Sequence, residues 1–155
     1  MSRITKTLET VAEVVGELLP DAEVMVSYNP EQDLNVVNTK KIYVFIVPDT
    51  VAEEDHNQGG TKWKDVITMM LAVARGIKNM RDCVPEVEAM LDKMENLRDR
   101  LRTKIMRGVA VIRGNHTPSR PVYNRDELEE NHLFLGYLLL EARTPGIKND
   151  HQEAE

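Results

Sequence analysis

The chain has 155 residues, of which 41% are hydrophobic and 30% charged, and its formal net charge at pH 7 is −6. These values are typical of one soluble globular domain that builds its core without disulfides or metals. The single cysteine, Cys83, excludes an internal disulfide, and no apolar run approaches the roughly 20 residues that a membrane helix needs.

The first third of the chain predicts a helix followed by two strands. Apolar residues recur at helical spacing from Ser2 to Leu19, and Pro20 ends that helix. Residues 22–28 alternate in the manner of a short strand. The clearest strand is residues 41–47, which are apolar on both faces and are stopped by Pro48. A strand buried on both faces implies layers above and below the sheet.

The middle of the chain allows more than one interpretation. Residues 50–62 are polar and acidic and contain Gly59-Gly60, so they predict a mobile loop or a long hairpin connection that projects from the body. From Trp63 to Met80 the apolar positions fit both a helix and one face of a strand. Composition favours the helix, because Met, Leu and Ala are good helix formers.

A long helix and a short strand are predicted next. The helix begins at Asp82 or Cys83, with Pro85 in its first turn, and a continuous apolar stripe runs along it to Leu101. A short strand follows over residues 109–113, and the segment from Gly114 to Pro121 is a predicted loop.

The last predicted core element covers residues 133–143, after one helical turn at residues 126–131. The apolar run fits a buried helix when taken alone. After the Pro121-Val122-Tyr123 lead-in, its side chains alternate between two apolar faces, so we interpret it as a strand in which Gly136 marks a bulge or a close neighbour. Residues 1–143 are thus expected to form a single α+β domain and residues 144–155 a flexible polar tail.

No motif predicts a catalytic, cofactor or metal site. The run Glu53-Glu54-Asp55-His56 is acidic, but consecutive side chains diverge. Residues 59–62 lack the first glycine and the ending of a phosphate-binding loop. The four histidines are scattered, and Cys83 at a helix start has no marked histidine partner. We expect no enzyme, no cofactor and no bound metal.

The charges are distributed unevenly along the chain. Residues 98–120 contain seven basic residues and one acidic residue, whereas residues 121–155 contain three basic and eight acidic residues. This polarity suits head-to-tail charge matching with a neighbour, although the basic run could also follow nucleic-acid phosphates or be solvated. The candidate residues for a partner or subunit interface are Arg75, Arg98, Arg100, Arg102, Lys104, Arg107 and Tyr123.

The order of the segments carries a resemblance to a known family. KIYVFIVP is followed by WKDVITMMLAVARGI, then VPEVEAMLDKMENLRDRL, then PVYNRDELEENHLFLGYLLLEAR, with Pro121, Tyr123, Asn124, Leu128 and Phe134 in the last segment. Over about residues 42–143 this pattern resembles the tail terminator or tail completion proteins of the bacteriophage neck. The chain departs from that family in two places: residues 69–73 are apolar throughout, and residues 98–104 are unusually basic.

The resemblance implies an α+β subunit, with a mixed or antiparallel sheet flanked by helices, that assembles into a ring, commonly a hexamer. The implied partners are copies of itself, the tail tube protein and a head-completion or connector protein. DNA passes through such a ring without specific binding, no membrane is involved, and the ring performs no catalysis. The expected location is the virion, after synthesis in the host bacterial cytoplasm. The alternative function is a nucleic-acid-binding module that uses residues 98–120.

Overall fold

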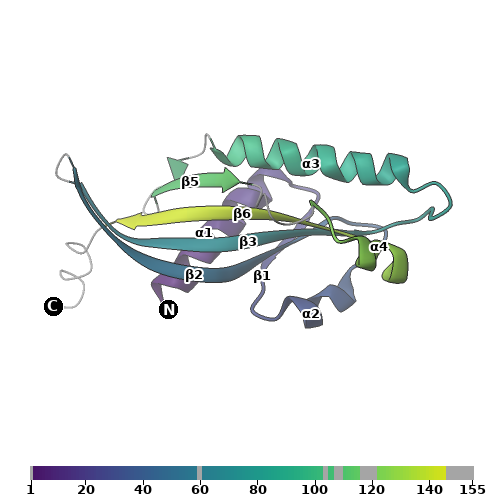
Figure 1. Cartoon of the computed structure of the whole chain (residues 1–155), viewed down its shortest axis with the longest axis horizontal. Coiled ribbons are helices and arrows are strands. Elements are labelled where there is room, and N and C mark those ends of the chain that lie inside the picture. Colours follow the sequence, from purple (N-terminus) through teal and green to yellow (C-terminus); the bar gives the residue numbers. More distant parts are fainter. Residues whose placement is uncertain (1, 59–60, 103–104, 107–109, 116–121, 146–155) are drawn as a thin grey trace.

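A mixed sheet forms the centre of the protein in the computed structural model, which describes residues 2–58, 61–102, 105–106, 110–115 and 122–145 (Figure 1). Its order in the described residues is β1-β2-β3-β6-β5-β4. The strands are β1 (Glu23–Val26), β2 (Tyr43–Gln58), β3 (Thr61–Gly76), β4 (Ile105–Met106), β5 (Ala110–Asn115) and β6 (Leu133–Pro145). β1 is parallel to β2, and the other neighbouring pairs are antiparallel. The α+β fold class and the mixed sheet predicted from the sequence are confirmed.

The helices α1, α3 and α4 lie where the sequence predicts them, whereas the short helices α2 and η1 were not predicted. They are α1 (Arg3–Leu18), α2 (Pro30–Asp33), the 3₁₀ helix η1 (Leu34–Val36), α3 (Val84–Arg102) and α4 (Arg125–Asn131). The Ser2 hydroxyl accepts the Thr5 backbone N–H at 3.0 Å and caps α1, and Pro85 sits in the first turn of α3, where a missing N–H costs nothing.

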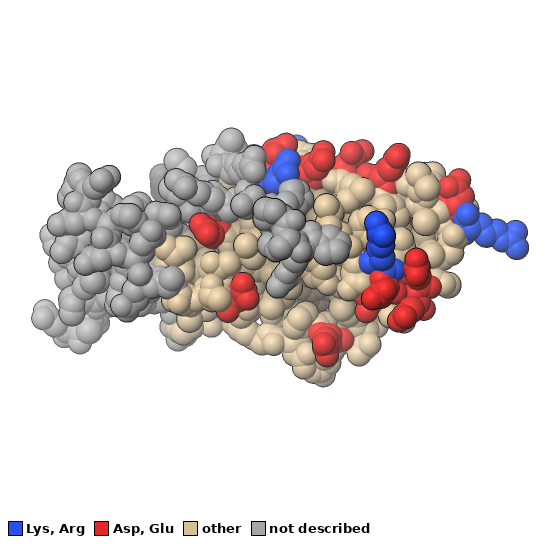
Figure 2. Space-filling view, in the orientation of Figure 1, with Lys and Arg blue, Asp and Glu red and all other residues tan. Residues whose placement is uncertain are grey.

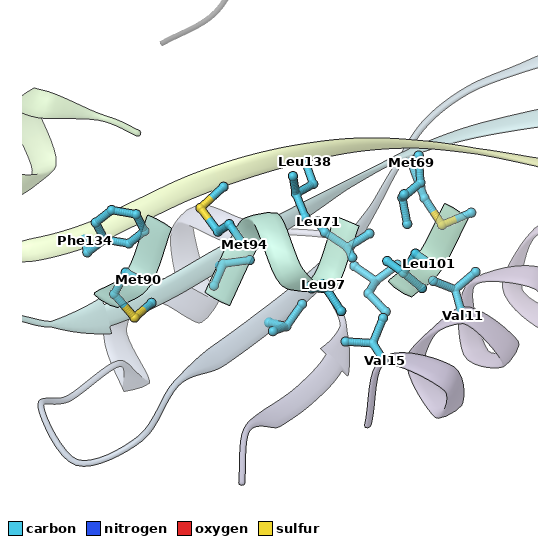
Figure 3. Close-up of a cluster of buried hydrophobic side chains, with 14 of the residues drawn as sticks. Val11, Val15, Met69, Leu71, Met90, Met94, Leu97, Leu101, Phe134 and Leu138 are labelled. Carbon is cyan, nitrogen blue, oxygen red and sulfur yellow. The ribbon is translucent and has the colours of Figure 1, made fainter. Parts of the chain in front are cut away.

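The larger core lies between one face of the sheet and helices α1 and α3. The apolar stripe of α3 packs onto β3 and β6, and α1 packs beside it (Figure 3). Every second residue of the two central strands faces this core. The buried members from these strands are Ile67, Met69, Leu71 and Val73 of β3 and Phe134, Leu138, Leu140 and Ala142 of β6.

A smaller core covers part of the opposite face of the sheet. Tyr43 and Phe45 of β2 stack with ring centroids 6.2 Å apart, and they pack with Leu135 of β6. Leu34 of η1 and Val37 cover this cluster from outside the sheet. Burial on both faces is why residues 42–47 are apolar throughout, and it confirms the layers expected on both sides of that strand.

The segment from Trp63 to Met80 fitted both a helix and a strand, and the compositional preference for a helix is wrong, because Thr61–Gly76 is the central strand β3. The side chains of Ile67, Met69, Leu71 and Val73 enter the larger core, and those of Ala72 and Ala74 enter the smaller one. Helix propensities differ by less than about 0.7 kcal/mol per ordinary residue, whereas burying an apolar side chain gains about 1.5–3 kcal/mol. The free energy gained by pairing with two strands and by burial in two cores therefore exceeds the helix propensity of this segment.

Pro48 does not end its strand, contrary to expectation. Glu23 and Ser27 donate their backbone N–H groups to the carbonyls of Ile42 and Ile46, both at 2.9 Å, so even-numbered residues in this part of β2 point their backbone groups away from β3. Pro48 falls on that outer side, where its missing N–H breaks no bond to β3. The register shifts after Pro48 and the strand continues to Gln58.

Residues 50–62 are therefore not a mobile loop, and the alternative of a long hairpin connection is closer to the structure. β2 runs to Gln58 and β3 begins at Thr61, leaving residues 59–60 outside the described residues. The two strands extend past the helices as a projecting hairpin (Figure 1). The apparent loop is part of two paired strands with polar composition.

β6 is a strand, as expected from its two alternating apolar faces. Gly136 sits in unbroken register with Val73, so it marks a close neighbour rather than a bulge. That neighbour is Met94 of α3. β6 continues to Pro145, two residues past the expected end of the domain, and residues 146–155 lie outside the described residues. Within the predicted loop over residues 114–121, Gly114 and Asn115 belong to β5, and residues 116–121 lie outside the described residues.

Candidate interaction surface

The basic segment begins at the C-terminal end of α3, which contains Arg98, Arg100 and Arg102. The Nε of Arg98 lies 3.4 Å from a carboxylate oxygen of Asp99, and Arg100 donates a 3.5 Å hydrogen bond to the Leu18 carbonyl at the end of α1. Both guanidinium groups therefore have partners within the chain. The Arg102 side chain, and all of Lys104 and Arg107, lie outside the described residues. That these basic residues contact a partner or a neighbouring subunit stays a prediction.

Arg75 lies near the end of β3, away from those arginines. It donates a 3.4 Å hydrogen bond to the Thr39 carbonyl, and its Nε has no hydrogen-bond partner among the described residues. Its guanidinium interacts electrostatically with Glu86 in the first turn of α3, which is about 18 Å along the helix axis from Arg98 at 1.5 Å per residue. The structure thus separates two members of the predicted set.

Tyr123 packs within the chain. Its ring stacks on Phe134 with centroids 5.5 Å apart, and its backbone forms a bridge to Gly136 of β6. The side chain is only partly exposed and borders the larger core. Tyr123 therefore has a clear packing role, and its part in an interface stays a prediction.

Glu86 anchors the loop between β3 and α3. Its two carboxylate oxygens accept the backbone N–H groups of Asn79 and Lys78, each at 3.0 Å. These bonds favour the charged form, and with the positive charges of Arg75 and Lys78 they hold the pKa of Glu86 below its ordinary value of 4.5. The carboxylate is a structural clamp.

Glu86→Gln should lower the free energy of unfolding at pH 7 by about 1–2 kcal/mol, because a neutral amide is a weaker acceptor for both N–H groups. A folded-state pKa below the unfolded one makes this stabilisation complete above pH 4.5 and lost as the pH falls through the folded pKa. Urea unfolding at pH 7 and in acid should show the two proteins converging at low pH. Glu88→Gln, an exposed neighbour in the same turn, is the matched control, and a constant difference at all pH values would contradict the clamp.

One pocket of about 470 Å³ lies between η1 and α4. Its lining residues are Glu31, Leu34, Asn35, Val37, Glu127, Asn131 and Leu133. The Asn131 amide donates to Glu127 at 3.0 Å. The polar lining of the pocket consists of two carboxylates, Glu31 and Glu127, and two amides, Asn35 and Asn131. It escaped sequence reasoning because segments about 90 residues apart form it.

The outer edge of β2 is unpaired over most of its length among the described strands. Only Tyr43 to Ile46 pair with β1, and beyond Ile46 no strand lies on that side of β2 among the described residues. Val51, on this stretch, is a large apolar residue that is 47% exposed. Residues 48–58 carry four acidic residues and no lysine or arginine. The sequence did not predict this edge, because residues 50–62 were interpreted as a mobile loop or a long hairpin connection and not as part of a core strand.

Acidic side chains also gather over α4 and along α3 on the face shown in Figure 2. The described part of the chain contains no group of three or more His, Cys, Asp or Glu side chains placed to hold a metal ion. None of the helices in the described ranges is both long enough and apolar enough to cross a membrane. Comparison of the chain with protein-family models finds no matching family, and comparison with curated proteins finds no match.

Proposed function

We propose that this protein is a structural subunit of a tailed-bacteriophage virion, and that copies of it form a ring at the neck that terminates the tail tube and joins it to the head-side connector. The observation that carries the proposal is the projecting β2–β3 hairpin, whose outer edge on β2 has no strand partner beyond Ile46 among the described residues (Figure 1). Such an edge offers backbone hydrogen bonds to a neighbouring chain.

The segments that carry the family resemblance form one packed unit, which supports the proposal. Tyr123 stacks on Phe134, Leu128 of α4 reaches the larger core, and the Asn124 side chain accepts the Glu127 N–H at 3.1 Å to cap α4. A shared structural motif would show this kind of mutual packing. The uneven charge along the chain gives further support, because ring neighbours meet through different surfaces.

The proposed partners are five further copies of the chain, the tail tube protein and a head-completion or connector protein. The role needs neither catalysis nor a cofactor. It places the protein in the virion, after synthesis in the cytoplasm of the host bacterium.

Electron cryo-microscopy and mass photometry of the purified protein, with and without tail tubes of the same phage, test the proposal. We expect rings, with six copies as the predicted number, at the ends of the tubes. Some subunits of this kind assemble only on the tail, so the sample with tubes decides the outcome. A protein that stays monomeric and leaves the tube ends bare contradicts the proposed function.

A further inference from the structure

We infer that the pocket between η1 and α4 binds the side chain of an arginine that belongs to a basic segment of a partner protein. The pocket has a volume of about 470 Å³, within the range of roughly 300–1,000 Å³ that is usual for ligand sites in proteins. It is formed within a single chain, so the inference is independent of the proposed ring.

Three apolar residues in the lining select a ligand with a hydrocarbon part. Leu34 and Val37 are half-buried and Leu133 is buried, and all three also pack in the smaller core. A small hydrated ion gains nothing from such a surface. Arginine and lysine side chains place their methylene stems along apolar surface while the charged group stays among polar partners. The lining therefore suits an amphipathic cation.

Two carboxylates give the pocket its charge. Glu31 lines it from α2 and Glu127 lines it from α4. Neither carboxylate forms an ion pair with another described residue, and the lining contains neither lysine nor arginine among the residues that the structure describes. A ligand that enters the pocket meets negative charge that the protein itself does not neutralise, so the pocket favours a cation over a neutral or anionic ligand.

The local structure of α4 holds one of these carboxylates in place. The Glu127 backbone N–H donates to the Asn124 side chain at 3.1 Å, and its carbonyl accepts the N–H of His132, which ends α4 with φ of 52°. Its carboxylate accepts the Asn131 amide at 3.0 Å. Binding to a fixed acceptor loses less side-chain entropy. A carboxylate offers about four lone-pair sites, so Glu127 can also accept a guanidinium group, whose planar donors match it better than an ammonium group does.

The surface beside the pocket favours a protein as the source of the arginine. Asp126, Glu129 and Glu130 of α4 are exposed and do not line the pocket, and acidic side chains gather over this helix in Figure 2. A small cation confined to the pocket would leave these charges solvated. A protein segment with further basic residues would contact them as well, whereas nucleic acid would be repelled.

Nuclear magnetic resonance titration of the isotope-labelled protein with N-acetylarginine amide tests the pocket. We expect backbone shift changes centred on Asn35, Val37 and Asn131, with a dissociation constant on the order of 1 mM. N-acetylcitrulline amide, a neutral ligand of nearly the same shape, should not bind. The backbone spectrum of each variant described next also checks that it is folded.

Charge-neutral variants test the two carboxylates. Glu31→Gln with Glu127→Gln should raise the dissociation constant for N-acetylarginine amide about tenfold or more. Glu129→Gln with Glu130→Gln removes the same net charge outside the lining and is the matched control, which should bind this ligand like the wild type. Equal binding of the citrulline compound, shifts scattered over the surface, or unchanged binding by the Glu31→Gln, Glu127→Gln protein would overturn the arginine site.

A short peptide with one arginine flanked by lysines tests the source of the arginine. It should bind about tenfold more tightly than N-acetylarginine amide, and the Glu129→Gln, Glu130→Gln protein should lose that gain. Equal affinities for the peptide and the amide would assign the pocket to a free small molecule and overturn the protein partner.

Discussion

Phe134→Ala should lower the free energy of unfolding by about 3–5 kcal/mol, the usual cost of truncating a buried aromatic side chain. Phe134 is fully buried in the larger core and is among its largest side chains. Its ring faces α3 near Met90 and stacks on Tyr123 with centroids 5.5 Å apart (Figure 3). Truncation would thus leave a cavity between β6 and α3 and remove the support for the segment that leads into α4. Urea denaturation followed by circular dichroism measures the loss.

Tyr123→Phe is the control for that experiment. It keeps the stacked ring and removes only the hydroxyl of a partly exposed side chain, so we expect a change within about 0.5 kcal/mol. A Phe134→Ala protein destabilised by less than about 1 kcal/mol would show that this part of the core is not packed as described.

Gly136→Ala should destabilise the protein by about 1–3 kcal/mol, although alanine normally suits a strand better than glycine. A Cβ at this position would overlap the sulfur of Met94 and lie 2.8 Å from its methyl carbon. Met94 is itself 1% exposed, so its side chain has little room to move aside. Thermal and urea unfolding of the variant measure this overpacking.

Met94→Ala shows whether the effect of Gly136→Ala comes from the contact with Met94 or from the strand propensity of alanine. Alone it should cost about 2–5 kcal/mol, because it leaves a cavity under α3. Combined with Gly136→Ala, the total loss should be smaller than the sum of the two single losses, since the new methyl group occupies space that the methionine vacates. Additive losses would mean that the two positions do not touch.

Local sequence patterns were sufficient to assign helix or strand to those elements whose apolar spacing fits only one of the two. The apolar stripe of α3 has the spacing of a helix, and Pro85 marks the first turn of that helix. The same holds for α1, which Pro20 follows. For β6, alternation on two apolar faces after the Pro121-Val122-Tyr123 lead-in was enough to choose a strand over a buried helix. These signals lie within a few residues of the element that they specify.

The candidate interaction surface depended much more on contacts distant in sequence. The sequence shows the charges of Arg75 and Arg100, but their carbonyl partners, Thr39 and Leu18, lie 36 and 82 residues away in the sequence and meet them only in the folded chain. Tyr123 was selected from a motif, and its stack on Phe134 appears only once β6 lies beside it. The free edge of β2 depends on where β1 ends, which composition does not encode.

The sequence by itself determined the α+β class, the two long helices α1 and α3, and the buried final strand, because each rests on a period that short-range geometry imposes. Only the tertiary structure decided that Trp63 to Gly76 is a strand and that β2 continues past Pro48. In both places the local conformational preference is small, a few tenths of a kcal/mol per residue, or fits more than one secondary structure. Pairing with β2 and β6, burial in two cores and an outer position for Pro48 are worth more, and they exist only when the whole sheet is assembled.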